Sequence, residues 1–188
     1  MPSKAEVARA LHAVWRLARL DRSALRDFDL SHEGVWRSFW AAAICYPGFL
    51  LLLLTRLDTD TVAQFGFLNI VIIQSIAFVV AWTAFPLLVL YYCKWIGRED
   101  EGFAFIVVYN WSQVLQTGLL LLAAIGNAMI FPDNLAPDID LVAYAAVLAF
   151  EWFIALVAIG AGGWIALSIV FFDLALGSII AVIAEKLY

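Results

Sequence analysis

From about residue 35 onward, the chain is a succession of apolar runs, each long enough to cross a lipid bilayer. A transmembrane helix needs about 20 mainly apolar residues, because it rises about 1.5 Å per residue through a hydrocarbon core of about 30 Å. Across the chain 65% of residues are hydrophobic and 14% are charged, whereas soluble domains hold about 45–50% apolar and about 25% charged residues. The sequence therefore predicts an all-α, polytopic transmembrane helix bundle of about five spans.

Charged and turn-forming residues set the predicted limits of these spans. The second apolar run would be a helix of about 50 Å, so it must tilt, kink at Pro86 or project past the membrane. The last run, 141–188, would be about 72 Å long as one helix, so we expect a reversal at Gly160–Gly163. Four spans with a re-entrant piece is the alternative. The domain of residues 35–188 is thus predicted to have spans at 35–56, 62–96, 103–131, 138–160 and 163–187.

Residues 1–34 are predicted to form a cytoplasmic segment with a basic amphipathic helix. Apolar side chains recur at helical spacing within residues 4–20, and the arginines fall largely off that stripe, which consists of Val7, Leu11, Val14 and Ala18. Such a helix lies in the headgroup region of the bilayer or packs on the mouth of the bundle, and the two placements are compatible. Ser31 is predicted to cap the next helix, and Glu33 to pair with Arg37 four residues later.

Basic residues are concentrated on one predicted side of the membrane. Of the eleven Lys and Arg residues, only Arg56 and Lys186 fall on the opposite side. Because positive charge accumulates on the cytoplasmic side, the N-terminus is predicted to be cytoplasmic and the C-terminus, after five spans, to lie outside. Tryptophan and arginine side chains favour the membrane interface. The predicted interface residues are Trp15, Arg16, Trp36, Trp40 and Trp95.

Two acids fall inside the last predicted hairpin. Glu151 and Asp173 each lie about 16 Å from the glycine turn, which is near the middle of the hydrocarbon core. A charged side chain at that depth costs about 2.5–3.5 kcal/mol, so acids in membrane spans usually face the bundle interior and mark a function. Polar side chains of two other spans reach a similar depth. The predicted intramembrane polar site comprises Glu151, Asp173, Gln113, Asn110, Thr117 and Gln74.

These polar residues fit two interpretations. In the first they form a proton-linked or cation-linked site, or a polar cavity for a small substrate. In the second they are structural, because buried polar side chains hydrogen-bond across membrane helices for about 0.6–2 kcal/mol each.

Motifs for other functions do not occur in the sequence. It contains no GxxxxGK[ST], GxGxxG, HExxH or GxSxG pattern, so neither catalysis, a cofactor nor nucleic-acid binding is predicted. Cys45 and Cys93 fall at different predicted depths and are expected to be free thiols. His12 and His32 are the only histidines, so no metal site is predicted.

A basic N-terminal segment followed by five closely spaced hydrophobic helices resembles the Yip1-domain family, over residues 35–188. The Asp-Leu-Tyr-Gly-Pro motif of eukaryotic members is missing, and residues 44–48 read Ile-Cys-Tyr-Pro-Gly instead, so no functional residue is carried over. The resemblance implies a role in membrane organisation or trafficking through partner binding. The stretch DFDLSHEGVWRSFW resembles membrane proteins of proteobacteria, which implies a bacterial inner membrane.

The function predicted from the sequence is accordingly that of a membrane-organising, partner-binding protein. Its expected partners are the lipid bilayer and another membrane protein, or a second copy in a homo-oligomer. A small transporter or proton-linked channel subunit that uses the midplane carboxylates is the alternative. A membrane enzyme acting on lipid headgroups near His32 and Glu33 is the third possibility.

Overall fold

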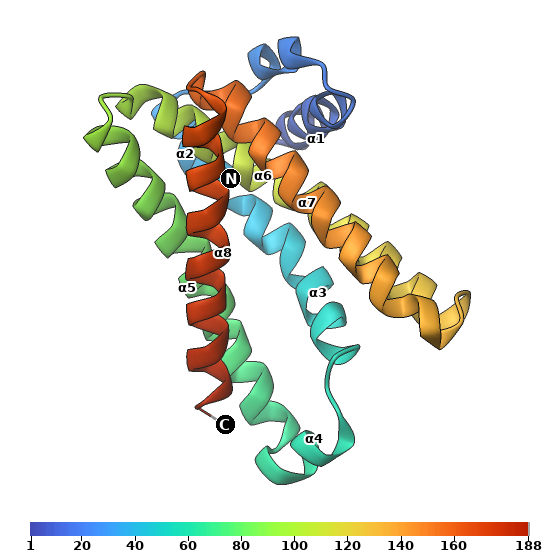
Figure 1. Ribbon diagram of the computed structural model, residues 1–188. Helices are drawn as coiled ribbons and strands as arrows, with labels where there is room; N and C mark the ends of the chain where they lie inside the picture. Colours follow the sequence, from blue (N-terminus) through green and yellow to red (C-terminus); the bar gives the residue numbers. More distant parts are fainter. Residues whose placement is uncertain (188) are drawn as a thin grey trace.

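The computed structural model describes residues 1–187, in which every regular element is a helix. Tyr188, the last residue of the predicted domain, lies outside that range. Five helical stretches are long and apolar enough to cross a bilayer, which confirms the predicted fold class (Figure 1). In chain order the elements are α1 (Lys4–Ala18), the 3-10 helix η1 (Arg22–Asp27), α2 (His32–Ser38), α3 (Trp40–Leu54), α4 (Thr59–Phe65), α5 (Phe67–Trp95), α6 (Glu99–Met129), the 3-10 helix η2 (Asp133–Leu135), α7 (Ala136–Ile159) and α8 (Gly163–Glu185).

Two spans differ in detail from the sequence prediction. The first candidate span, His32–Leu54, consists of α2 and α3 joined at Phe39. The second begins at Phe67 rather than at residue 62, because Gly66 adopts a φ of 83° that separates the short helix α4 from α5. Only glycine adopts that conformation at little cost, so the chain changes direction there. Pro86 lies within the continuous helix α5.

Helix α6 is the centre of the bundle. It packs against α1, α2, α3, α5 and α7, while α8 packs against α5 and α7. Helices α7 and α8 meet at the turn after Ile159, where Gly160 is left-handed with a φ of 63°. Figure 1 shows α7 and α8 diverging from that turn toward their other ends. The bundle is therefore tightly closed at one end and splayed at the other.

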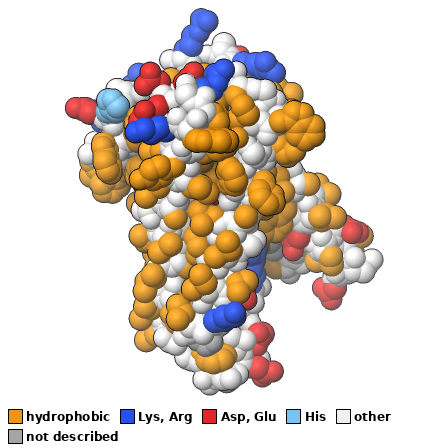
Figure 2. Space-filling model, turned by 60° about the vertical axis from the view of Figure 1, so that its left-hand side comes forward, with side chains coloured by type: hydrophobic (Ala, Val, Ile, Leu, Met, Phe, Trp, Pro, Cys, Tyr) orange, Lys and Arg blue, Asp and Glu red, His pale blue; other side chains and the backbone are white. Residues whose placement is uncertain are grey.

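The outer faces of the spans suit a lipid environment. Exposed large apolar side chains include Ile72 and Ile76 on α5 and Leu167 and Phe171 on α8. Figure 2 shows hydrophobic side chains over the middle of the molecule, with charged side chains toward its ends. Soluble monomers rarely expose continuous apolar patches of this extent. The arrangement confirms that the chain is an integral membrane protein in contact with the bilayer.

The N-terminal residues form a layer on the closed end of the bundle. Helix α1 packs against α6, and its buried side chains are Ala10, Ala13, Val14 and Leu17. Of the two placements predicted for this helix, packing on the bundle is the one observed. The predicted cap at Ser31 is also confirmed, because its Oγ accepts a hydrogen bond of 3.0 Å from the Gly34 amide.

Ion pairs hold this layer together. Arg16 pairs with Asp21 and Asp27. Arg37 pairs with Glu6 at 2.7 Å and also, as predicted, with Glu33. Hydrogen bonds from neighbouring side chains, Ser23 first and then Arg16, lower the pKa of Asp21 to about 2.

Candidate functional site

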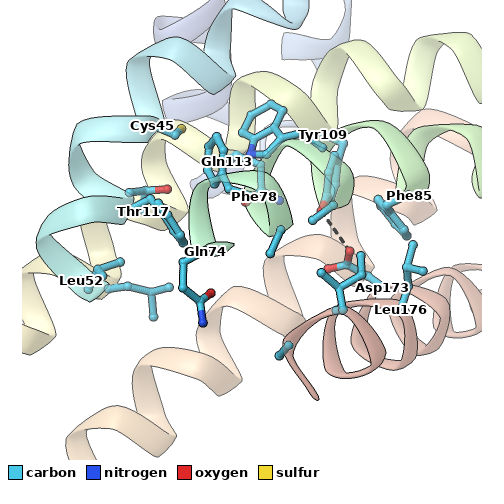
Figure 3. Close-up of a pocket in the computed structure, with 18 residues that line it drawn as sticks. Cys45, Leu52, Gln74, Phe78, Phe85, Tyr109, Gln113, Thr117, Asp173 and Leu176 are labelled. Atoms are coloured by element: carbon cyan, nitrogen blue, oxygen red, sulfur yellow. Dashed lines mark hydrogen bonds between the residues drawn. The ribbon is translucent and has the colours of Figure 1, made fainter. Parts of the chain in front are cut away.

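A cavity of about 330 Å³ lies within the membrane-spanning part of the bundle, between α3, α5, α6 and α8. Figure 3 shows side chains from these helices around it. Small residues of α5 and α8 leave space on one side, namely Ala77, Ala81, Gly177 and Ala181. The volume is in the range of about 300–1,000 Å³ that is usual for small-molecule sites.

Four of the six predicted polar residues line this one cavity. They come from three helices: Gln74 from α5, Gln113 and Thr117 from α6, and Asp173 from α8. Residues far apart in the sequence thus contribute polar groups to one cavity whose lining is mostly apolar.

The carboxyl group of Asp173 has a partner that the sequence did not reveal. The hydroxyl of Tyr109 donates a hydrogen bond of 3.1 Å to its Oδ1 (Figure 3). Tyr109 also lines the cavity. A signal for it was available, because residues 109, 113 and 117 are spaced four apart and so lie on one face of a helix.

Glu151 lies outside the cavity wall, on α7, and its side chain is 1% exposed. Its carboxyl group interacts directly with that of Asp173. Counted from the turn-side ends of their helices, the two residues lie about 12 and about 15 Å deep, which explains how they meet. Two neighbouring carboxylates in a medium of low dielectric repel each other strongly, so a shared proton would stabilise such a pair.

Basic side chains do not neutralise this pair. Residues 99–185, which include all of α6, α7 and α8, contain no lysine or arginine. The charge on Glu151 and Asp173 can therefore be balanced only by protons or by a cation that enters the cavity.

The structural interpretation of these residues requires that each polar group has a partner. Within residues 1–187, however, Glu151 Oε1 and Gln116 Nε2 are buried without a hydrogen-bond partner. A buried polar atom left unpaired costs about 1–3 kcal/mol. Interhelical hydrogen bonding therefore does not account for all the polar atoms at this depth.

Asn110 is separated from the other predicted site residues. Its Nδ2 donates a hydrogen bond of 2.8 Å to Ser38 Oγ, which joins α6 to α2. The reason is that α6 is surrounded by other helices, so side chains about 60° apart on its surface meet different neighbours. Asn110 therefore has a structural contact, and the cavity wall is formed without it.

The predicted interface residues gather at the closed end of the bundle. Trp36 is 77% exposed and Trp95 82%, and Trp15 and Trp40 are also exposed. Arg16 instead points toward η1, where it forms its ion pairs. The sequence reasoning missed Trp164, which is 84% exposed at the start of α8.

No group of three or more His, Cys, Asp or Glu side chains that could hold a metal ion occurs in the described residues. Comparisons of the chain with family models, with curated proteins and with solved structures returned no match. The resemblance to the Yip1-domain family thus rests on the number and spacing of the spans alone.

Proposed function

We propose that this polytopic membrane protein is a small proton-linked transporter or channel subunit. In this proposal the cavity binds a small ligand, and Glu151 and Asp173 exchange a proton with bulk water. The function is one of binding and transfer rather than catalysis. The predicted polar residues Gln74, Gln113 and Thr117 orient the ligand from the cavity wall.

One observation carries this proposal. Asp173 lies on the cavity wall and at the same time contacts the buried carboxyl of Glu151. A ligand in the cavity therefore alters the electrostatic environment of a proton that the pair holds. Binding and proton exchange are coupled through this single side chain.

We place the closed end of the bundle at the cytoplasmic face of a bacterial inner membrane. Nine of the eleven basic residues belong to this end. Seven lie within residues 1–37, Lys94 lies in the last turn of α5, and Arg98 follows that helix. Arg98 also donates a hydrogen bond of 3.0 Å to the Ile159 carbonyl at the neighbouring turn. The positive-inside tendency supports this orientation.

Infrared spectroscopy of the full chain in lipid nanodiscs tests the proposed proton exchange. Between about pH 5 and about pH 10, the carbonyl band of protonated carboxyl groups should lose intensity reversibly. The loss should be smaller in Asp173→Asn and Glu151→Gln. It should be unchanged in the control Asp133→Asn, because Asp133 is exposed at the end of the fourth span and does not line the cavity. A band that stays constant over this range would mean that the pair is purely structural, and the proposal would fail.

The membrane-organising role predicted first from the sequence makes a different prediction. Extraction into native-lipid nanodiscs, followed by mass spectrometry, should then yield a stoichiometric protein partner or a second copy. A lone chain that retains a small molecule supports the proton-linked function instead.

A further inference from the structure

The cavity wall is rich in aromatic side chains. Two clusters contribute: Phe49 and Phe78 have ring centroids 4.8 Å apart, and Phe78 lies 5.8 Å from Trp82. Phe85 and Tyr109 are 4.7 Å apart in the other cluster. The faces of aromatic rings carry partial negative charge and attract cations, with trimethylammonium-type groups among the best-known ligands.

The charged groups of the cavity wall also favour a cationic ligand. Asp173 is its only acidic side chain, and none of the lining residues is a lysine or an arginine. An anionic ligand would meet a carboxyl group and aromatic faces without any compensating positive charge. A monocation would meet one carboxylate, and desolvated opposite charges attract strongly at low dielectric.

Much of the remaining wall is apolar and would contact an apolar part of the ligand. Leu52, Leu120, Leu176 and Ile180 border the same space. A volume of about 330 Å³ corresponds to about eleven waters at about 30 Å³ each. An inorganic ion would leave most of this apolar surface without contacts, whereas an organic group would fill it.

On the basis of the proposed proton-linked function, we propose that the cavity binds an amphipathic organic monocation of the alkyl- or arylammonium class. Its positive centre lies between Asp173 and the aromatic side chains, and its apolar part contacts the leucines and Ile180. The doubly protonated carboxyl pair releases one proton to bulk water for each monocation that binds. The net charge of the site is thereby the same before and after binding.

Equilibrium binding of radiolabelled benzyltrimethylammonium to the full chain in lipid nanodiscs tests this inference, with empty nanodiscs as the background. Saturable binding should strengthen about tenfold per pH unit in the range where one proton is released per cation. A pH indicator in weakly buffered solution should record that proton. Neopentylbenzene, in which carbon replaces the charged nitrogen, should not displace the cation.

Three variants locate the site. Asp173→Asn should abolish saturable binding, and Trp82→Leu should weaken it severalfold without touching a charge. Asp138→Asn, an acid outside the cavity, serves as the matched control and should bind as the unaltered chain does. Circular dichroism and size-exclusion chromatography check that each variant is folded.

The outcomes separate the two proposals. Absence of saturable binding by the unaltered chain, equal binding by Asp173→Asn, or displacement by neopentylbenzene would each overturn the organic-cation site. If the infrared titration still shows proton exchange in that case, the proposed function stands with a ligand of another class. If the titration is flat as well, both proposals fail together.

Discussion

Replacing Gly48 by alanine tests how closely α3 approaches α6 beside the cavity. A Cβ atom at this position would lie 2.7 Å from the methyl carbon of Thr117 and 3.1 Å from Cδ1 of Leu121. Thr117 is β-branched and therefore stiff at χ1, so its methyl group cannot rotate away freely. Extra methyl groups forced into close packing usually cost about 1–3 kcal/mol.

The expected net change combines this cost with a gain in helix propensity. Alanine is favoured over glycine within a helix by about 0.5–1 kcal/mol. Gly48→Ala should therefore lower the free energy of unfolding by about 0.5–2 kcal/mol. Gly118→Ala is the matched control, since a Cβ there would meet no atom within 4 Å, and it should stabilise the protein by about 0.5–1 kcal/mol.

Reversible unfolding in mixed detergent micelles, followed by circular dichroism, measures both changes. The double variant Gly48→Ala with Thr117→Ser removes the methyl group that clashes and should recover most of the loss. If Gly48→Ala is as stable as Gly118→Ala, the helices do not approach as described. If Thr117→Ser does not restore stability, the clash lies elsewhere.

Three further predictions concern the site, the N-terminal layer and the orientation. Tyr109→Phe removes a hydrogen bond worth about 1.5–3 kcal/mol to a carboxylate and about 0.5–1.5 kcal/mol to the neutral carboxyl of the empty site. The affinity for benzyltrimethylammonium should therefore fall about 5- to 13-fold with the fold intact, and an unchanged affinity would show that the hydroxyl plays no part. Because the pKa of Asp21 is lowered to about 2 from an ordinary 3.8, its contribution to stability is present above about pH 4 and is lost as the pH falls toward about 2. Hydrogen exchange of the η1 amides should follow this loss, and Arg16→Ala should move it to higher pH; the same midpoint in both proteins would contradict the role of the arginine. In a chain without other cysteines, an impermeant maleimide added to intact cells should label a cysteine at Asp133 but not one at Ser3, and the reverse pattern would invert the proposed orientation.

The features that the sequence predicted well depend on local interactions. The length of an apolar run decides whether it can span a bilayer, irrespective of its neighbours, so the bundle of five spans followed directly. The cap at Ser31 and the pair between Glu33 and Arg37 join residues within four positions of each other. The start of α5 was predicted too early because the sequence did not reveal that Gly66 adopts a φ of 83°, which separates α4 from α5.

The cavity could not be predicted in the same way, because its shape depends on distant packing. Depth arguments gave the level of each polar residue in the membrane but not the direction in which its side chain points. Asn110 and Gln113 are three residues apart, and yet one contacts Ser38 of α2 while the other lines the cavity. Only the positions of the helices around α6 decide which of these two contacts a side chain makes.

The arrangement of the acids gives them unequal roles. Asp173 borders the cavity, whereas Glu151 is buried and does not line it, although its carboxyl group interacts with that of Asp173. Since residues 99–185 supply no positive charge, any charge that Asp173 gains or loses must be met by a proton on the pair or by a cation in the cavity. Ligand contact and proton storage therefore fall on different residues, and this division allows one side chain to be altered without the other.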